Sequence, residues 1–301
     1  MDQPVVDVNG LSRSFAHKKA LDGVSFRATA GQVYGLVGSN GAGKTTLLKH
    51  LLGLLRATEG SVRVFGLDPV RDPVGVLSRV GYLSEERELP EWMSIDELLR
   101  YTQAYHPNWD ASYARELLET FALDPAKKIK DLSKGMRAQA GLIAAVAYRP
   151  ELLILDEPSS GLDAVVRRDI LDAIVRAVAD DGRTVIFSSH LLDEVERMSD
   201  HVTMIQQGRV TLSGALDDVR RDYRRSRVRF TEHFERPPVI DTALAMEGGG
   251  RSWSVIHSGS PEQFLKSVRD RGGEVVESRD ATLEEIFLAR AGRGRPQAEA
   301  A

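Results

Sequence analysis

The sequence predicts an α/β fold in which helices cover a largely parallel sheet, followed by a small α+β domain. The first observation is a set of short apolar runs, Val33–Val37, Leu152–Asp156 and Thr184–Ser188, separated by helical patterns. Continuous apolar runs are typical of parallel strands buried on both faces, and alternating strands and helices favour a parallel sheet. The second observation is a change of character near Leu216, where an arginine-rich segment begins.

Composition places the chain among ordinary globular proteins. Of its 301 residues, 42% are hydrophobic and 28% are charged, and its net charge is -4, so no basic excess points to nucleic acid. The absence of cysteine excludes disulfides and thiol catalysis. The start of the sequence does not resemble a signal peptide, and the apolar run 141–147 is too short to span a bilayer. We therefore expect a cytosolic protein whose membrane role, if any, needs a partner.

A glycine-rich loop with the spacing G-x-x-x-x-G-K-T follows the apolar strand Val33–Val37 and precedes a helix. This context identifies a P-loop, because glycines let consecutive N–H groups point inward and the helix adds its positive end. Lys44 supplies a charge for the β- and γ-phosphates, and the Thr45 hydroxyl is a ligand for Mg²⁺. The alternative is a glycine-rich turn that binds nothing. The residues expected at the phosphates are Gly38, Asn40, Gly41, Ala42, Gly43, Lys44, Thr45 and Thr46.

The first 218 residues are expected to form one P-loop NTPase domain with an antiparallel N-terminal β subdomain. The subdomain would contain the strands Val5–Val8 and Ala20–Phe26. A helical subdomain at about 88–148 is inserted into the α/β pattern. Its first helix begins at the capping box of Ser94 and Glu97.

The rest of the chain is expected to form a separate small domain. Residues 219–227 read as an arginine-rich linker, 228–291 as an α+β domain and 292–301 as a disordered tail. Strands are expected near Val228–Thr231, Val239–Ala245 and Ser252–His257, and capping boxes at Ser260 and Thr282 begin two helices. The arginines could contact anionic lipid head groups, or they could form a solvated face.

Three polar residues end the predicted parallel strands. Asp156 and Glu157 follow a buried strand, where α/β sheets place ligands. Asp156 could hold Mg²⁺ through water, and Glu157 could polarise the water that attacks the γ-phosphate. A strand-end pair could instead cap the next turn. His190 ends the following strand and could contact the γ-phosphate, although a lone histidine there is often a surface residue.

Taken together, these motifs resemble the nucleotide-binding subunit of an ABC transporter. Leu132–Met136 matches the family signature in its leucine, serine and second glycine, and Leu152–Glu157 matches its Walker B motif. Ser160–Asp163 is similar to its D-loop, and His190 is similar to its switch histidine. Order and spacing agree over about residues 4–215. The signature and Thr282–Phe287 are similar to the ABC-2-type exporter branch, whose permease is usually a separate polypeptide.

The resemblance implies a mechanism in which two ATPase subunits dimerise head to tail around two ATP molecules. Ser133, the Gly135 N–H and Asp163 of one chain would face the nucleotide held by the other, and Phe15 would stack on adenine. The cofactors would be ATP and Mg²⁺, the latter held by Thr45, Asp156 and Glu85. The partners are a second ATPase subunit, identical or related, and a permease. No nucleic acid is expected, and the protein would lie on the inner face of the cell membrane.

Two positions depart from the family pattern. Glu85 replaces the usual glutamine, and a carboxylate can ligate Mg²⁺ but only accepts hydrogen bonds. We keep Glu85 as a catalytic and metal candidate beside the alternative of a surface acid. Lys134 replaces a signature glycine, and it could face solvent or add charge near the phosphate. Phe15 could also pack in a core rather than stack on adenine.

Other functions of the same family remain as alternatives. A soluble ABC ATPase in translation or DNA maintenance usually has two ATPase modules or a coiled-coil or zinc insertion, and the chain has a single P-loop and no cysteine. An importer subunit ranks below it, because the signature does not resemble that branch. A P-loop kinase would leave Asp156, Glu157 and the signature unused.

Overall fold

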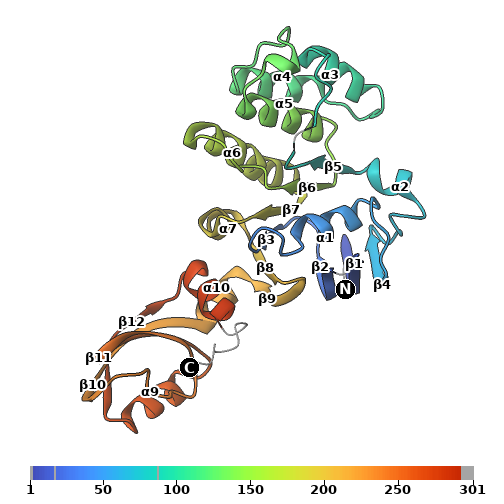
Figure 1. The fold of residues 1–301 in the computed structure, drawn as a ribbon. Helices are drawn as coiled ribbons and strands as arrows, with labels where there is room; N and C mark the ends of the chain where they lie inside the picture. Colours follow the sequence, from blue (N-terminus) through green and yellow to red (C-terminus); the bar gives the residue numbers. More distant parts are fainter. Residues whose placement is uncertain (1–2, 17, 87, 293–301) are drawn as a thin grey trace. The chain divides into compact units, whose positions relative to one another are not determined.

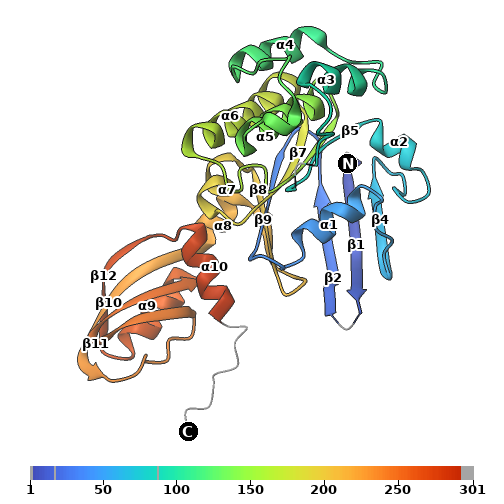
Figure 2. The ribbon, with the colours of Figure 1, turned by 45° about the horizontal axis from the view of Figure 1, so that its top comes forward.

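The computed structural model describes residues 3–16, 18–86 and 88–292. The chain divides into two compact units, Met1–Ser213 and Gly214–Ala301. Both units are drawn in Figure 1 and, in a second view, in Figure 2. Each is described separately below.

A six-stranded sheet forms the centre of the first unit, with the strand order β5-β6-β7-β3-β8-β9. Strands β5, β6, β7, β3 and β8 pair in parallel, as the apolar runs predict. The strands are β3 (Val33–Val37), β5 (Val80–Leu83), β6 (Leu152–Asp156), β7 (Thr184–Ser189), β8 (His201–Gln206) and β9 (Arg209–Ala215). Every residue of β3, β6 and β7 is buried, which explains why their sequences do not alternate in polarity.

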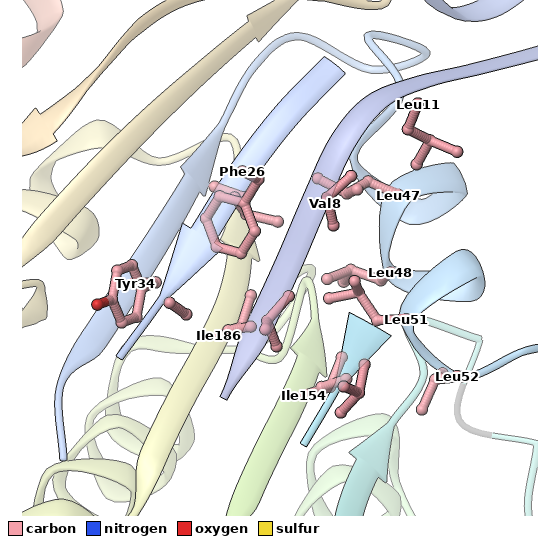
Figure 3. Close-up of a cluster of buried hydrophobic side chains, with 14 of the residues drawn as sticks. Val8, Leu11, Phe26, Tyr34, Leu47, Leu48, Leu51, Leu52, Ile154 and Ile186 are labelled. Atoms are coloured by element: carbon pink, nitrogen blue, oxygen red, sulfur yellow. The ribbon is translucent and has the colours of Figure 1, made fainter. Parts of the chain in front are cut away.

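An antiparallel sheet packs beside it, in the order β2-β1-β4. Its strands are β1 (Val6–Phe15), β2 (Lys18–Ala28) and β4 (Glu59–Val64). The sequence predicted this subdomain, but it placed a break in β1, which instead continues through irregular pairing after Val8. The helix α1 (Lys44–Leu51) packs its leucines against both sheets, and Figure 3 shows Leu47, Leu48 and Leu51 among Val8 and Ile154. The loop before α1 is therefore fixed by a buried helix.

The inserted helices lie together in both views. They are α3 (Ile95–Gln103), α4 (Ala111–Thr120), η1 (Ile129–Asp131) and α5 (Lys134–Val146). The predicted capping box begins α3, since Ser94 Oγ accepts from the Glu97 N–H at 3.2 Å and Glu97 accepts from the Ser94 N–H at 2.7 Å. The remaining helices of the unit are α2 (Pro73–Leu77), α6 (Ala164–Asp181) and α7 (Leu192–Met198). The sequence analysis missed α2, which has only five residues.

As far as residue 292, the second unit consists of a three-stranded antiparallel sheet, in the order β11-β10-β12, with three helices. Its elements are α8 (Leu216–Asp222), β10 (Tyr223–Phe234), β11 (Ala243–Ser258), α9 (Pro261–Arg269), β12 (Gly273–Asp280) and α10 (Leu283–Gly292). One face of the sheet packs with α9 around Val228, Phe230, Trp253 and Phe264. The unit thus has a hydrophobic core of its own.

Two expectations for this region differ from the structure. The arginine-rich segment 220–227 is not a linker: it ends α8 and opens β10, where Ser226 and Val228 are fully buried and the arginines at 225, 227 and 229 alternate with them. From 225 to 229 every second residue of this half-buried strand is an arginine, and the resulting charge density suggested a linker. The strand expected at Val239–Ala245 begins only at Ala243 and continues to Ser258. Of the expected tail, 292–301, Gly292 ends the last helix, and residues 293–301 lie outside the described part of the chain.

No helix in the described ranges is both long enough and apolar enough to cross a bilayer.

Candidate functional site

A cavity of about 470 Å³ lies beside the glycine loop and the start of α1. It collects residues that are far apart in the sequence, from the β1–β2 hairpin, the glycine loop, the segment after β5 and the end of β6. The lining residues are Phe15, Lys18, Ala20, Asn40, Gly41, Ala42, Gly43, Lys44, Thr45, Thr46, Glu85 and Glu157. Most of the predicted phosphate contacts therefore share one cavity.

Two glycines of the loop are required by close backbone approaches. A Cβ on Gly38 would lie 2.3 Å from the Ile205 carbonyl oxygen. Gly43 has φ +117°, which side chains rarely adopt, and its Cβ would lie 2.7 Å from the Ala20 carbonyl oxygen. At these two positions the backbone of the loop consequently packs directly against the neighbouring strands.

Lys44 is buried and holds two contacts inside the cavity wall. Its Nζ donates to the Gly38 carbonyl oxygen at 2.6 Å and lies 3.0 Å from Glu157 Oε1. The second contact is an ion pair without hydrogen-bond geometry, because Glu157 Oε1 has no hydrogen-bond partner. A buried ammonium needs such partners to offset its lost hydration. The Lys44 charge is thus held at the loop, beside the cavity.

The ends of β6 and β7 are joined through Ser188. Its hydroxyl donates to Asp156 Oδ1 at 2.7 Å and accepts from the Glu157 N–H at 2.9 Å. Glu157 has φ +48°, a left-handed conformation that costs roughly 1 kcal/mol in a residue other than glycine. Strain of this kind persists where neighbouring contacts hold it.

His190 contacts the other oxygen of the Glu157 carboxylate. Its Nδ1 lies 2.7 Å from Glu157 Oε2, and because a carboxylate only accepts, Nδ1 carries the hydrogen. The Glu157 side chain is 5% exposed and the His190 side chain 40% exposed, so the pair lies between the interior and the surface. Glu157 therefore lies between Lys44 and His190, with one oxygen toward each.

Glu85 and Phe15 are both exposed and both line the cavity. Phe15 is 43% exposed and lies outside the hydrophobic cores of the described residues. The Arg13 guanidinium lies 4.9 Å from its ring centroid. The ring is thus accessible to a second planar group.

Ser133, Gly135 and Asp163 lie apart from this cavity, at the starts of α5 and α6. Ser133 is exposed, and its hydroxyl accepts from the Met136 N–H at 3.2 Å. A Cβ on Gly135 would lie 3.1 Å from Val166, so glycine permits the close packing of α5 on α6. Asp163 is exposed and accepts from the N–H groups of Val165 and Val166 at 3.0 Å each.

Sequence reasoning missed several residues at the cavity. Lys18 and Ala20 line it from β2, and no motif marks them. Ser188 fixes Asp156 and Glu157, and its position two residues before His190 was the available signal. Tyr82 of β5 lies near Asp156: burial, followed by the charges of Asp156 and Glu86, raises its pKa to about 12.

Comparison with known proteins assigns the class. The family model described as "ABC transporter" matches residues 21–160. The "Daunorubicin resistance ATP-binding protein DrrA3" of Streptomyces coeruleorubidus is 32% identical, with all of both chains covered. The "ABC transporter ATP-binding protein YtrB" of Bacillus subtilis is 27% identical, over 97% of this chain and 99% of its own length.

A solved structure described as the ATP binding subunit of an ABC transporter is 31% identical, with a TM-score of 0.67. The match covers 72% of the present chain and 92% of the solved chain. The chain belongs to the ATP-binding proteins of ABC transporters. It is an ATPase subunit that binds ATP, and it has the P-loop α/β fold of that family.

Proposed function

We propose that this chain hydrolyses ATP to power a separately encoded permease of the ABC-2 exporter type. The observation that carries the proposal is the position of Glu157, which contacts Lys44 and His190 at the wall of the P-loop cavity. The exporter assignment rests on the sequence match at 282–287 and on the full-length similarity to a daunorubicin resistance protein.

The proposed nucleotide position follows from the cavity wall. The triphosphate lies against the N–H groups of Asn40 to Thr46. It replaces Glu157 as the ionic partner of the Lys44 ammonium group. Adenine stacks on the exposed Phe15 ring at the other end of the cavity. Entry of the phosphates thus frees one oxygen of the Glu157 carboxylate.

The oxygen donors near the phosphates suit Mg²⁺. Thr45 and Glu85 line the cavity, and Asp156 ends the neighbouring strand with Oδ1 bound to Ser188. In the described part of the chain no cluster of three or more acidic or histidine side chains forms a metal cage. Mg²⁺ commonly binds one or two protein oxygens and completes its shell with water and substrate phosphates, so the donors fit this metal. When bound, it would neutralise charge on the β- and γ-oxygens.

We assign the proton transfer to Glu157. We assign to His190 the role of orienting the Glu157 carboxylate. The Glu157 carboxylate accepts a proton from the attacking water, and the His190 Nδ1–H holds Oε2 in place. Ser188 fixes the peptide between Asp156 and Glu157. The chain thereby aligns the water with the γ-phosphate.

A second copy, or a related chain, would complete the site. The exposed start of α5 presents Ser133 and a helix N-terminus, and Asp163 lies at the start of α6. Such N–H groups bind anions, so this surface is suited to the γ-phosphate held by the P-loop of the other subunit. Hydrolysis would remove the shared contacts and separate the subunits.

The permease is expected at a second groove of the first unit, of about 570 Å³. Leu54 and Leu77 line it and are 60% and 38% exposed, with charges of both signs beside them from Lys49 and Glu88. Exposed apolar side chains with a polar rim are typical of protein interfaces. We place an amphipathic helix of the permease there, which would hold the subunit at the inner face of the membrane.

The test is recovery of the tagged chain from solubilised membranes together with an integral membrane protein. Leu77→Glu should abolish recovery from membranes and leave basal ATPase activity unchanged. Val74→Glu is the matched control, since Val74 is 77% exposed on the same helix and does not line the groove. Recovery with ribosomes or DNA instead of a membrane protein would favour a soluble ABC ATPase.

A further inference from the structure

The face of the second unit's sheet opposite α9 carries a basic pocket that the proposed ATPase function does not use. The pocket has a volume of about 280 Å³. Its lining consists of three arginines, one serine and one glutamate, from all three strands: Arg225, Arg227, Ser254, Glu277 and Arg279. It lies on the face opposite the one that packs with α9.

The register of the sheet places these side chains side by side. Arg225 pairs directly with Arg279 of β12. Arg227 pairs with Ser254 of β11 and with Glu277 of β12. Directly paired residues of an antiparallel sheet point to the same face, about 5 Å apart, and two arginines in such a pair repel each other. Something must therefore offset the repulsion between Arg225 and Arg279.

Glu285 of α10 is that group. Its carboxylate accepts from Arg225 Nη1, from Arg279 Nη2 at 2.5 Å and from Arg279 Nη1 at 3.0 Å. Burial alone would raise the pKa of Glu285, but hydrogen bonds from Arg279, the Thr282 N–H and Arg225 lower it to about 2. The two arginines already bind a carboxylate at one side of the pocket, and paired arginine N–H groups bind the oxygens of carboxylates and phosphates alike.

Of the three arginines that line the pocket, Arg227 is held least tightly by other side chains. Its only ion pair among the described residues is with Glu277, at 3.7 Å, and both side chains are more than half exposed. Arg225 is fixed by its Nε hydrogen bond to Ser254 Oγ at 2.8 Å. The three guanidinium groups face two carboxylates, Glu277 and Glu285, so one positive charge is in excess.

We propose that this pocket binds a compact phosphate-type oxyanion, with Arg227 as its main ligand and Arg225 and Ser254 beside it. Arg227 has five N–H donors in a fork that matches two oxygens of a phosphate. The oxyanion could be a free phosphate or the head group of an anionic lipid, and both present the same oxygens. The site is distinct from the P-loop, whose ligands come from the first unit.

The test uses the full chain with its P-loop saturated with ADP and Mg²⁺, so that added phosphate does not compete there. Inorganic phosphate is titrated at constant ionic strength, and NMR follows the arginine Nε–H signals. We expect saturable shifts of the Arg227 and Arg225 signals. Because the signals are site-specific, failure of the P-loop assignment would leave this readout unaffected.

Arg227→Ala should weaken phosphate binding at least tenfold, measured at the Arg225 signal. Arg227→Lys should bind phosphate with intermediate affinity, because lysine keeps the positive charge but lacks the planar guanidinium with its paired N–H donors. Arg229→Ala is the matched control: Arg229 is exposed on the same strand, two residues further, and does not line the pocket. Equal weakening in Arg227→Ala and Arg229→Ala, or no saturable shift at Arg227, would overturn the proposal.

Vesicles distinguish the two sources of the oxyanion. If a lipid head group is the ligand, phosphatidylglycerol vesicles should retain the protein in flotation, phosphatidylcholine vesicles should not, and Arg227→Ala should abolish retention while Arg229→Ala keeps it. If the free anion is the ligand, phosphate shifts the signals and neither vesicle retains the protein. Retention that both variants lose equally would indicate nonspecific charge attraction and contradict a built site.

Discussion

Glu157 occupies a left-handed backbone conformation because its neighbours hold both its peptide and its carboxylate. Ser188 accepts from its N–H, while Lys44 and His190 contact separate carboxylate oxygens. The strain costs roughly 1 kcal/mol, which one good buried hydrogen bond is enough to offset. The residue is thus positioned before any substrate arrives, as its proposed role as general base requires.

Glu157→Gln should reduce ATP hydrolysis by two to four orders of magnitude, because the amide cannot accept the proton from water. ATP binding should persist, since the loop contacts are unchanged. Steady-state phosphate release and nucleotide titration measure the two effects. Turnover within a few-fold of the parent protein would exclude Glu157 as the base.

Lys44→Ala should abolish tight ATP binding by removing the only lysine of α1 that lines the cavity. Lys49→Ala provides the control, since Lys49 belongs to the same helix and lies outside that cavity. Fluorescent nucleotide titration should show normal affinity for the control. An affinity within a few-fold of the parent in Lys44→Ala would contradict the P-loop assignment.

His257 in the second unit makes stability depend on pH. Burial, followed by the charge of Arg224, lowers its pKa from 6.5 to about 4. Between these values the unfolded chain binds a proton that the folded protein does not. Lowering the pH from 7 to 5 should therefore decrease the free energy of unfolding by about 2 kcal/mol through this group.

Urea titrations at the two pH values measure this effect, with the fluorescence of the buried Trp253 as the signal for the second unit. His257→Gln should lose most of the decrease. His233→Gln should keep it, because His233 is exposed on β10. A decrease of the same size in His257→Gln and the parent would assign the pH dependence to other groups.

At the scale of elements, the sequence predicts best where one local pattern decides the outcome. The buried strands β3, β6 and β7 and the caps of α3 and α10 were predictable from apolar runs and capping residues. The second unit was less predictable, because long twisted strands such as β11 carry glycines and polar residues that resemble loop signals. These strands are stabilised by pairing with neighbouring strands, which a local sequence pattern cannot predict.

The capping box of α3 is open to a stability test. Ser94→Ala should lower the free energy of unfolding by about 1 kcal/mol, because the Glu97 N–H loses its acceptor. Thermal unfolding of the full chain measures the change. Ser78→Ala should be neutral, since in the described chain the exposed Ser78 side chain makes no hydrogen bond. Equal stability of Ser94→Ala and Ser78→Ala would contradict a contribution from the cap.

At the scale of the whole molecule, most of the predicted site residues form two groups. The P-loop residues, Glu85 and Glu157 share one cavity, whereas Ser133, Gly135 and Asp163 lie at the starts of α5 and α6. Motif spacing predicts a role in the site for both groups, and these roles stay predictions. It could not predict Lys18, Ala20 or Ser188, because their places depend on strand pairings between distant segments.

In the proposed mechanism, the γ-phosphate is bound jointly by the P-loop of one subunit and the start of α5 of another. The most direct measurement is the molar mass of Glu157→Gln by light scattering with saturating ATP or ADP. We expect a dimer with ATP, a monomer with ADP, and a monomer with ATP once Ser133→Arg is added, while Ser78→Arg leaves the dimer intact. An ATP-loaded Glu157→Gln protein that stays monomeric, or a dimer unaffected by Ser133→Arg, would contradict the account.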